Sequence, residues 1–237
     1  MVLTQYHPGI TTPAYQSPPD MERGNLLQPY MKNYQIFDCP SDPANDQARE
    51  TDDVTNMGLP PGNTPQQKLF YLAVKDDFGY NWQYLCPLVV DSSCPQIGDG
   101  QVCDKPVQIA NIAAPAHMIL GVDSLWDRHP DGSVVVAGGN DAVDPPCRIE
   151  ADGSDSFPYQ GNVEGFFWYG AWVPSMPLAW NVFGGAWPWH GDIVNTAFVD
   201  GHAKPFRVTQ LTAGCNVQDY WGGVIYDDTQ YLWSGRK

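Results

Sequence analysis

A histidine and an aspartate separated by nine residues are the groups in this chain that most resemble a catalytic pair. His190 and Asp200 stand in the segment HGDIVNTAFVDGH, and such residues can act as a general base and the carboxylate that orients it. No Ser or Cys in a nucleophile-elbow setting accompanies them, and Gly-x-Ser-x-Gly is absent. We therefore interpret Asp200 as the organiser of its turn and His190 as a locally hydrogen-bonded residue, in a protein that is not an enzyme.

Acidic turns are the second feature of the sequence that could carry chemistry, because they could bind a cation. Hard divalent cations prefer carboxylate and carbonyl oxygens in turns rich in Asp, Asn, Gly and Ser. Glu150, Asp152 and Asp155 supply three carboxylates around Gly153, which makes calcium the candidate cofactor. No turn matches the full EF-hand loop, and a solvated acidic turn is the alternative interpretation. The histidines lack His-x-x-x-His spacing, which disfavours a zinc enzyme.

Six cysteines point to an oxidising, extracellular setting. An even count in an acidic, turn-rich chain is typical of disulfide-bonded secreted proteins. A local bridge between Cys94 and Cys103 is the easiest to imagine, but six cysteines allow 15 pairings, so the connectivity stays open. No Cys-x-x-Cys pair occurs, which disfavours structural zinc.

Nine aromatic residues crowd the segment 166–189. Such a concentration is typical of a subunit interface, of a core or of a sugar-stacking platform, and we favour the interface. Rings supply large contact area at low entropic cost, as a self-associating protein requires. The nine are Phe166, Phe167, Trp168, Tyr169, Trp172, Trp180, Phe183, Trp187 and Trp189.

Short strands and many turns must position these groups. Gly (23) and Pro (22) disfavour long helices, and we expect one short helix within Asn25–Phe37, before Pro29 or just after it. Asp200-Gly201 predicts a two-residue type I′ hairpin turn, and Cys39–Pro43 predicts a second turn. Apolar or alternating patterns predict strands at Leu69–Val74, Gly79–Leu85, His117–Val122, Asn195–Val199 and His202–Val208, and a strand-like alternation over Asp219–Trp233.

Composition limits the partners and the number of domains. A net charge of −15 over 237 residues argues against nucleic acid and anionic membranes as partners. With 43% hydrophobic residues the chain can form a packed core. It contains no apolar run that could span a membrane and no visible signal peptide. We expect an extended N-terminal arm over residues 1–25 and a single globular domain over 26–237, with an aromatic-rich insertion near 159–189.

Four stretches in this order resemble the prepilin-type "H-X9-DG" family, relatives of type IV pilins and type II secretion pseudopilins. His190 to Gly201 carries the histidine, the nine residues and Asp-Gly. Leu27–Pro43 is similar to the family segment "PYxKNxQIFxCPSDP", and it includes Cys39, Pro40, Ser41 and Asp42. Gly79–Trp82 resembles the "YGYN" strand, and Ile109–Ser124 resembles "IxxPAxTILLADS". Together these stretches cover about half of the chain.

The resemblance implies a β-rich α+β fold, with a pilin-like antiparallel sheet, long loops and little helix. It also implies display outside the bacterial cytoplasmic membrane, at the cell surface or beyond. Family members normally begin with a prepeptidase site and a long apolar helix, and we expect this chain to start about where that helix would end.

We accordingly expect a structural subunit of an extracellular filament or pseudopilus. It would bind copies of itself through the aromatic surface, with the N-terminal arm as a second candidate contact. A secreted carbohydrate-binding or carbohydrate-active protein that uses the Trp-rich segment is the alternative.

Overall fold

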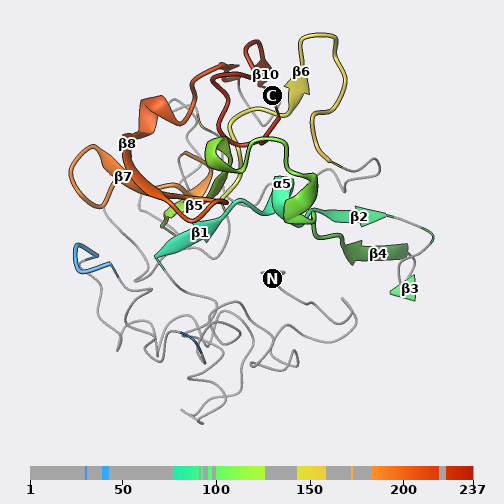
Figure 1. Cartoon of the computed structure of the whole chain (residues 1–237), viewed down its shortest axis with the longest axis horizontal. Helices are drawn as coiled ribbons and strands as arrows, with labels where there is room; N and C mark the ends of the chain where they lie inside the picture. Colours follow the sequence, from blue (N-terminus) through green and yellow to red (C-terminus); the bar gives the residue numbers. More distant parts are fainter. Residues whose placement is uncertain are drawn as a thin grey trace.

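The described part of the chain is β-rich and contains very little helix (Figure 1). The computed structural model describes residues 30, 39–42, 77–90, 92, 96–97, 100–125, 143–158, 172, 183–218 and 223–236. The predicted strand Leu69–Val74 and the arm over residues 1–25 lie outside these ranges. Of the segment around the predicted helix near Pro29, only Tyr30 is described. No helix among the described residues is long and apolar enough to cross a membrane.

A four-stranded antiparallel sheet forms the centre of the fold, in the order β1-β5-β7-β8. Its strands are β1 (Phe78–Tyr80), β5 (Ile119–Asp123), β7 (Ile193–Phe198) and β8 (Ala203–Arg207). Along β7 the side chains of Val194, Thr196 and Phe198 are buried and alternate with more exposed ones. Because strand side chains alternate between faces, one face of this sheet is covered by the core. The predicted strand His117–Val122 and the predicted hairpin strands are thereby confirmed, within two residues.

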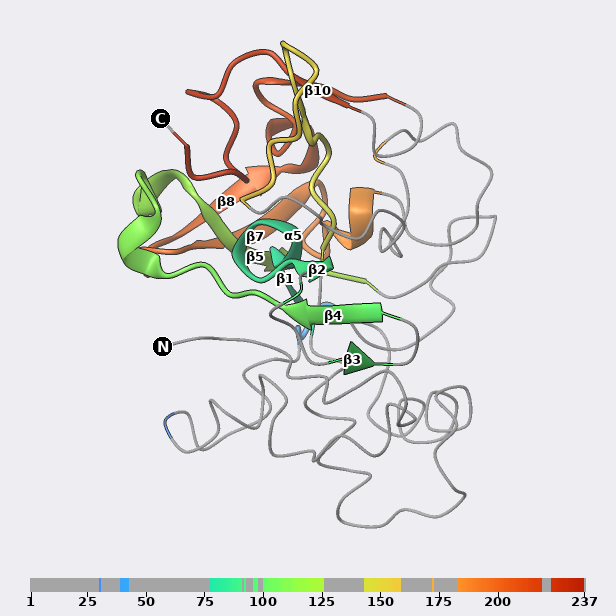
Figure 2. The same ribbon diagram turned by 90° about the vertical axis from the view of Figure 1, so that its right-hand side faces the viewer.

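Two smaller sheets flank the central one (Figures 1 and 2). The first contains β2 (Leu88–Val90), β4 (Gly100–Asp104) and β3 (Gln96–Ile97), and it extends away from the central sheet beyond α5 (Trp82–Leu85). The second contains β6 (Ile149–Glu150), β10 (Val224–Ile225) and β9 (Cys215–Asn216). Single 3-10 turns connect these strands: η5 (Ile109–Asn111), η6 (Pro115–His117), η7 (Phe183–Gly185) and η8 (Val208–Gln210).

Bulky aromatic side chains from distant segments fill the core. Tyr84 from α5 packs edge-on against Phe157 and Tyr231, and Trp172 packs edge-on against Trp233. The five side chains are at most 6% exposed. Buried aromatic rings supply large contact areas, so a few of them unite segments that regular pairing alone would hold weakly.

A disulfide between Cys147 and Cys215 joins the segment before β6 to β9 across 68 positions. Closing a loop of this length restricts the unfolded chain and is worth about 4 kcal/mol by the chain-entropy account. Tyr84 Oη and Tyr231 Oη both donate to the carbonyl oxygen of Cys147, at 3.3 and 2.6 Å. Cys147 is therefore fixed by its side chain and by its backbone at once.

The turn between β7 and β8 differs from the predicted type I′ turn. Gly201 N donates to Phe198 O at 2.9 Å, and Gly201 has a φ of +95°, but Asp200 does not have a positive φ. A type I′ turn needs positive φ at both central residues, so that prediction is wrong. The connection is instead a three-residue loop in which the glycine alone takes the left-handed position.

Residues 82–85 form a helical turn where the sequence predicted the continuation of a strand. The buried Asn81 side chain donates from Nδ2 to the carbonyl oxygens of Ile119 and Trp233, at 2.9 and 3.0 Å. These bonds hold the chain at the end of β1, and the following turn directs Tyr84 and Leu85 into the core. The strand-like alternation over Asp219–Trp233 is also largely wrong, because only Val224–Ile225 is a strand in its described part and turns follow it.

Two glycines with positive φ provide a matched stability test. A Cβ on Gly184 would lie 2.2 Å from Asp144 O, whereas a Cβ on Gly201 meets nothing within 4 Å. Gly201→Ala is expected to cost only left-handed strain, about 1–2 kcal/mol. Gly184→Ala carries the same strain plus the steric clash, and should cost clearly more. Urea unfolding of both variants measures the two costs, and equal values would contradict the close packing at Gly184.

Candidate functional site

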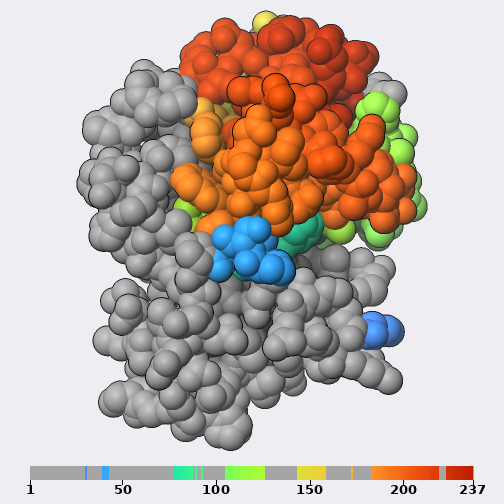
Figure 3. Space-filling view, turned by 90° about the vertical axis from the view of Figure 1, so that its left-hand side faces the viewer, coloured from blue at the N-terminus to red at the C-terminus, as the bar shows by residue number. Residues whose placement is uncertain are grey.

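The two most specific sequence motifs meet at His190, just before β7. His190 Nε2 lies 3.5 Å from Cys39 Sγ, and His190 Nδ1 lies 3.2 Å from Ser41 Oγ. The turn over residues 39–42 is closed by a bond from Asp42 N to Cys39 O of 2.9 Å, which confirms the turn predicted there. Figure 3 shows this turn (blue) against the orange surface of the described segment that begins at Phe183. Residues 151 positions apart thus form one site.

Two buried carboxylates lie beneath this contact. Asp123, at the end of β5, is 6% exposed, and Asp77, next to β1, is 3% exposed. Asp77 Oδ2 accepts the backbone N–H of Cys39. Asp123 Oδ2 accepts the backbone N–H of Asn195 at 2.7 Å and lies 3.8 Å from His190 Nε2. One carboxylate, just before β1, thus contacts the 39–42 turn, and the other, at the end of the adjacent β5, lies next to His190.

Burial and charge set the protonation of these groups. Burial raises the pKa of Asp123 to about 6, although the hydrogen bond from Asn195 and the nearby His190 oppose this shift. Burial also raises the pKa of the Cys39 thiol, and the charges of Asp123 and Asp77 add to the effect. A negative sulfur is disfavoured here because it would face two carboxylates.

Cys39 and His190 resemble a nucleophile and its base, but their surroundings do not favour that chemistry. Reactive cysteines have lowered pKa values in electropositive sites, and the pKa of Cys39 is raised. The N–H of Cys39, which an oxyanion hole would need, is bonded to Asp77. A developing oxyanion would be repelled by Asp77 and Asp123. The arrangement instead anchors the 39–42 turn to the sheet.

Asp200, the other half of the pair singled out in the sequence, lies in the β7–β8 loop. Its Oδ1 accepts the backbone N–H of His202 at 3.1 Å and lies 2.6 Å from His202 Nδ1. The ring of His202 stacks on Phe198 with centroids 4.2 Å apart. Asp200 organises its own loop, as expected, and the structure assigns it no contact with His190. The partners of His190 in the 39–42 turn are distant in sequence, whereas only local hydrogen bonds were expected.

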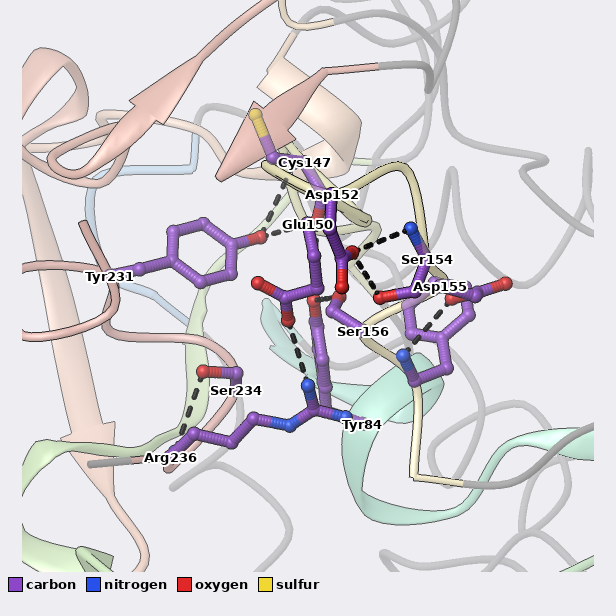
Figure 4. A network of polar contacts seen from close by, with 11 residues as sticks. Tyr84, Cys147, Glu150, Asp152, Ser154, Asp155, Ser156, Tyr231, Ser234 and Arg236 are labelled. Atoms are coloured by element: carbon purple, nitrogen blue, oxygen red, sulfur yellow. Dashed lines mark hydrogen bonds and ion pairs between the residues drawn. The ribbon is translucent and has the colours of Figure 1, made fainter. Parts of the chain in front are cut away.

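The three candidate calcium ligands are engaged in separate interactions with different partners (Figure 4). Glu150 Oε1 accepts from Arg236 Nη1 at 2.7 Å. Asp152 Oδ1 accepts from the backbone and hydroxyl of Ser154, and Asp155 Oδ1 accepts from the backbone of Phe157. In the described parts of the chain, no three His, Cys, Asp or Glu side chains form a group that could hold a metal ion. The calcium site stays a prediction.

The aromatic segment is described at four of its nine rings. Trp172 is 6% exposed, donates from Nε1 to Asp144 O at 2.8 Å, and belongs to the core where an interface was expected. Phe183, Trp187 and Trp189 are half-buried. Trp187 and Trp189 pack edge-on with centroids 6.4 Å apart. The expected interface residues Phe166, Phe167, Trp168, Tyr169 and Trp180 lie outside the described residues, as does Cys94 of the suggested Cys94–Cys103 bridge.

Sequence reasoning placed Cys39, Ser41 and His190 in motifs but missed that they touch. Only the resemblance carried a signal, since it assigned both motifs to one family. Comparisons with protein-family models, with curated proteins and with solved structures found no match for this chain.

The raised pKa of Asp123 predicts a pH-dependent stability. The carboxyl group of Asp123 binds its proton more tightly in the folded state than in the unfolded state. Its contribution to the free energy of unfolding is therefore fully favourable below about pH 4 and is lost as the pH rises through about 6. Asp123→Asn removes the ionisation but keeps an acceptor for Asn195. The variant should exceed the wild type in urea midpoint at pH 7.5, and the difference should shrink toward pH 4.5.

Asp192→Asn is the control, because Asp192 pairs with Arg207 at the surface and is 70% exposed. Its effect should be small at both pH values. If Asp123→Asn lowered the stability at pH 7.5, contacts of the carboxylate with His190 and Asn195 would outweigh its burial.

Proposed function

We propose that this chain is a structural subunit of an extracellular filament or pseudopilus and that it acts by binding copies of itself. The observation that carries the proposal is the contact of Cys39 and Ser41 with His190. It gives the two motifs that resemble the prepilin-type family a shared architectural role, at a place poorly suited to nucleophilic catalysis.

The edge of the central sheet supports assembly through side chains. β8 is an edge strand in the described sheet, and it carries Lys204, Pro205 and Arg207. Proline lacks the N–H that strand pairing needs, and charged edge residues oppose pairing with another chain. A polymer would therefore form by burial of apolar surface, worth about 25 cal/mol per Å² before association costs.

The half-buried rings of Trp187 and Trp189, together with that of Phe183, are the described part of the proposed contact surface. Trp189 Nε1 donates to Ser124 O at 2.8 Å, so the ring is fixed before any partner arrives. A rigid aromatic group loses little entropy on binding and is typical of interface hot spots. The arm over residues 1–25 is proposed as a second contact.

Carbohydrate binding is the alternative, and the same ring pair supports it. Fixed indole rings can stack on sugars as well as on protein. The two functions differ in what they leave in solution: a filament subunit forms polymers without ligand, whereas a sugar-binding protein stays monomeric and its Trp fluorescence responds to saccharides.

Truncation of the ring pair tests self-association. The double variant Trp187→Ala/Trp189→Ala should weaken assembly by at least about tenfold, since truncation of a hot-spot residue, often a Trp, costs about 2 kcal/mol or more. Analytical ultracentrifugation over a dilution series gives the association constant, and negative stain shows the polymers.

Tyr226→Ala is the matched control, because Tyr226 is also a large ring, lies elsewhere and is 65% exposed. It should leave assembly unchanged. A wild-type protein that stays monomeric at every concentration, or a double variant that assembles normally, would overturn the proposal.

Divalent cations are expected to support the assembly, because copies with a net charge of −15 repel one another. Chelation with EDTA should dissociate polymers, and added calcium should restore them, whereas moderate NaCl should not dissociate them. Light scattering follows both steps. Polymers that are indifferent to EDTA would remove calcium from the proposal.

A further inference from the structure

A cavity of about 360 Å³ opens beside the C-terminal segment, away from His190 and from the tryptophan pair. Val107, Ile112 and Met118 contribute apolar surface to its wall. Ligand pockets of 300–1,000 Å³ with apolar walls and a few convergent polar groups bind small organic molecules. The cavity has the size and wall chemistry of such a pocket.

Two buried residues that bear hydroxyl groups also line this cavity. Tyr84 and Ser156 line it, they are 2% and 0% exposed, and their hydroxyl groups are hydrogen-bonded to each other. Tyr84 Oη also donates to Cys147 O. Figure 4 shows this hydroxyl network and Arg236 in the same region of the fold. The polar atoms are thus held in place by the core.

Arg236 supplies a positive charge to the cavity. Its Nη1 donates to Glu150 Oε1 at 2.7 Å, and the side chain is 44% exposed. Within the described residues its Nε and Nη2 donors make no hydrogen bond. A guanidinium presents five donors in a plane and can therefore bind two carboxylates on different edges.

The backbone fixes Arg236 at this position. Gly235 has a φ of +62°, and a Cβ there would lie 2.5 Å from Met118 Sδ and 2.9 Å from Ile112 Cγ2. Gly235 O also accepts the backbone N–H of Ala114 at 3.2 Å. The close approach of this glycine fixes the backbone that carries Arg236 beside Ile112 and Met118.

We propose that this cavity binds a small organic monocarboxylate with an apolar body. The ligand carboxylate lies on the Nε–Nη2 edge of Arg236, and its carbon chain lies along Val107, Ile112 and Met118. A phosphate group suits the site less, because a single arginine already paired with Glu150 offers little charge for a dianion. Binding of a carboxylate in this cavity is separate from self-association and does not depend on it.

Calorimetric titration with straight-chain carboxylates from butanoate to octanoate tests the proposal on the wild-type chain. Each added CH₂ group should tighten binding about fourfold, as burial of apolar surface predicts. Hexanoate should bind at least about tenfold more tightly than 1-hexanol, because hydrogen bonds to charged groups are stronger than those between neutral groups.

Arg236→Gln should remove the preference for hexanoate over 1-hexanol. Arg207→Gln is the matched control, because Arg207 is also an exposed arginine paired with an acid, Asp192, but does not line the cavity. Equal affinity for hexanoate and 1-hexanol in the wild type, no dependence on chain length, or unchanged binding in Arg236→Gln would each overturn the proposal. The wild-type comparison of acid and alcohol decides the matter even if Arg236→Gln does not fold.

Discussion

The fold depends on the fixation of one buried residue, Cys147. Its sulfur is bonded to Cys215, and its carbonyl oxygen accepts hydrogen bonds from Tyr84 and Tyr231. The strands around it are each two residues long, and pairs so short are marginal by themselves. The disulfide and the buried hydrogen bonds therefore hold together segments that long paired strands would hold together in other β-rich domains. They join α5, the segment before β6 and the C-terminal segment to one point.

A second set of contacts links residues 39–42 to the central sheet. The backbone of Cys39 reaches Asp77, and its side chain, together with Ser41, reaches His190. The carboxylates of Asp77 and Asp123 make the same site unfavourable for a thiolate. In a positively charged environment the contact between Cys39 and His190 would suggest catalysis. In this negatively charged environment it anchors the 39–42 turn to the sheet. Electrostatic context, more than the identity of the residues, decides which role they take.

Sequence patterns predicted the strands whose burial alternates or runs unbroken. β5 and β7 follow from apolar residues on a covered face. β8, which is mostly exposed, follows from the Asp-Gly turn that returns the chain beside β7, and the turn at Cys39 follows from its prolines. The pattern did not predict the helical turn after Asn81, because the buried amide bonds to Ile119 and Trp233 come from distant segments. Asp-Gly likewise indicated a hairpin but not its loop length, which depends on the φ of Asp200. The meeting of His190 with Cys39 is a tertiary contact that no local pattern encodes.

The bond between Cys147 and Cys215 encloses both the β7–β8 hairpin and the tryptophan pair in a single covalent loop. A protease that cuts the backbone once anywhere inside this loop leaves the two fragments joined. Such a nicked molecule keeps its full mass until a reductant separates the pieces. The part of the chain that carries the proposed contact surface is therefore retained after a cleavage that would shed it from a protein without the bond.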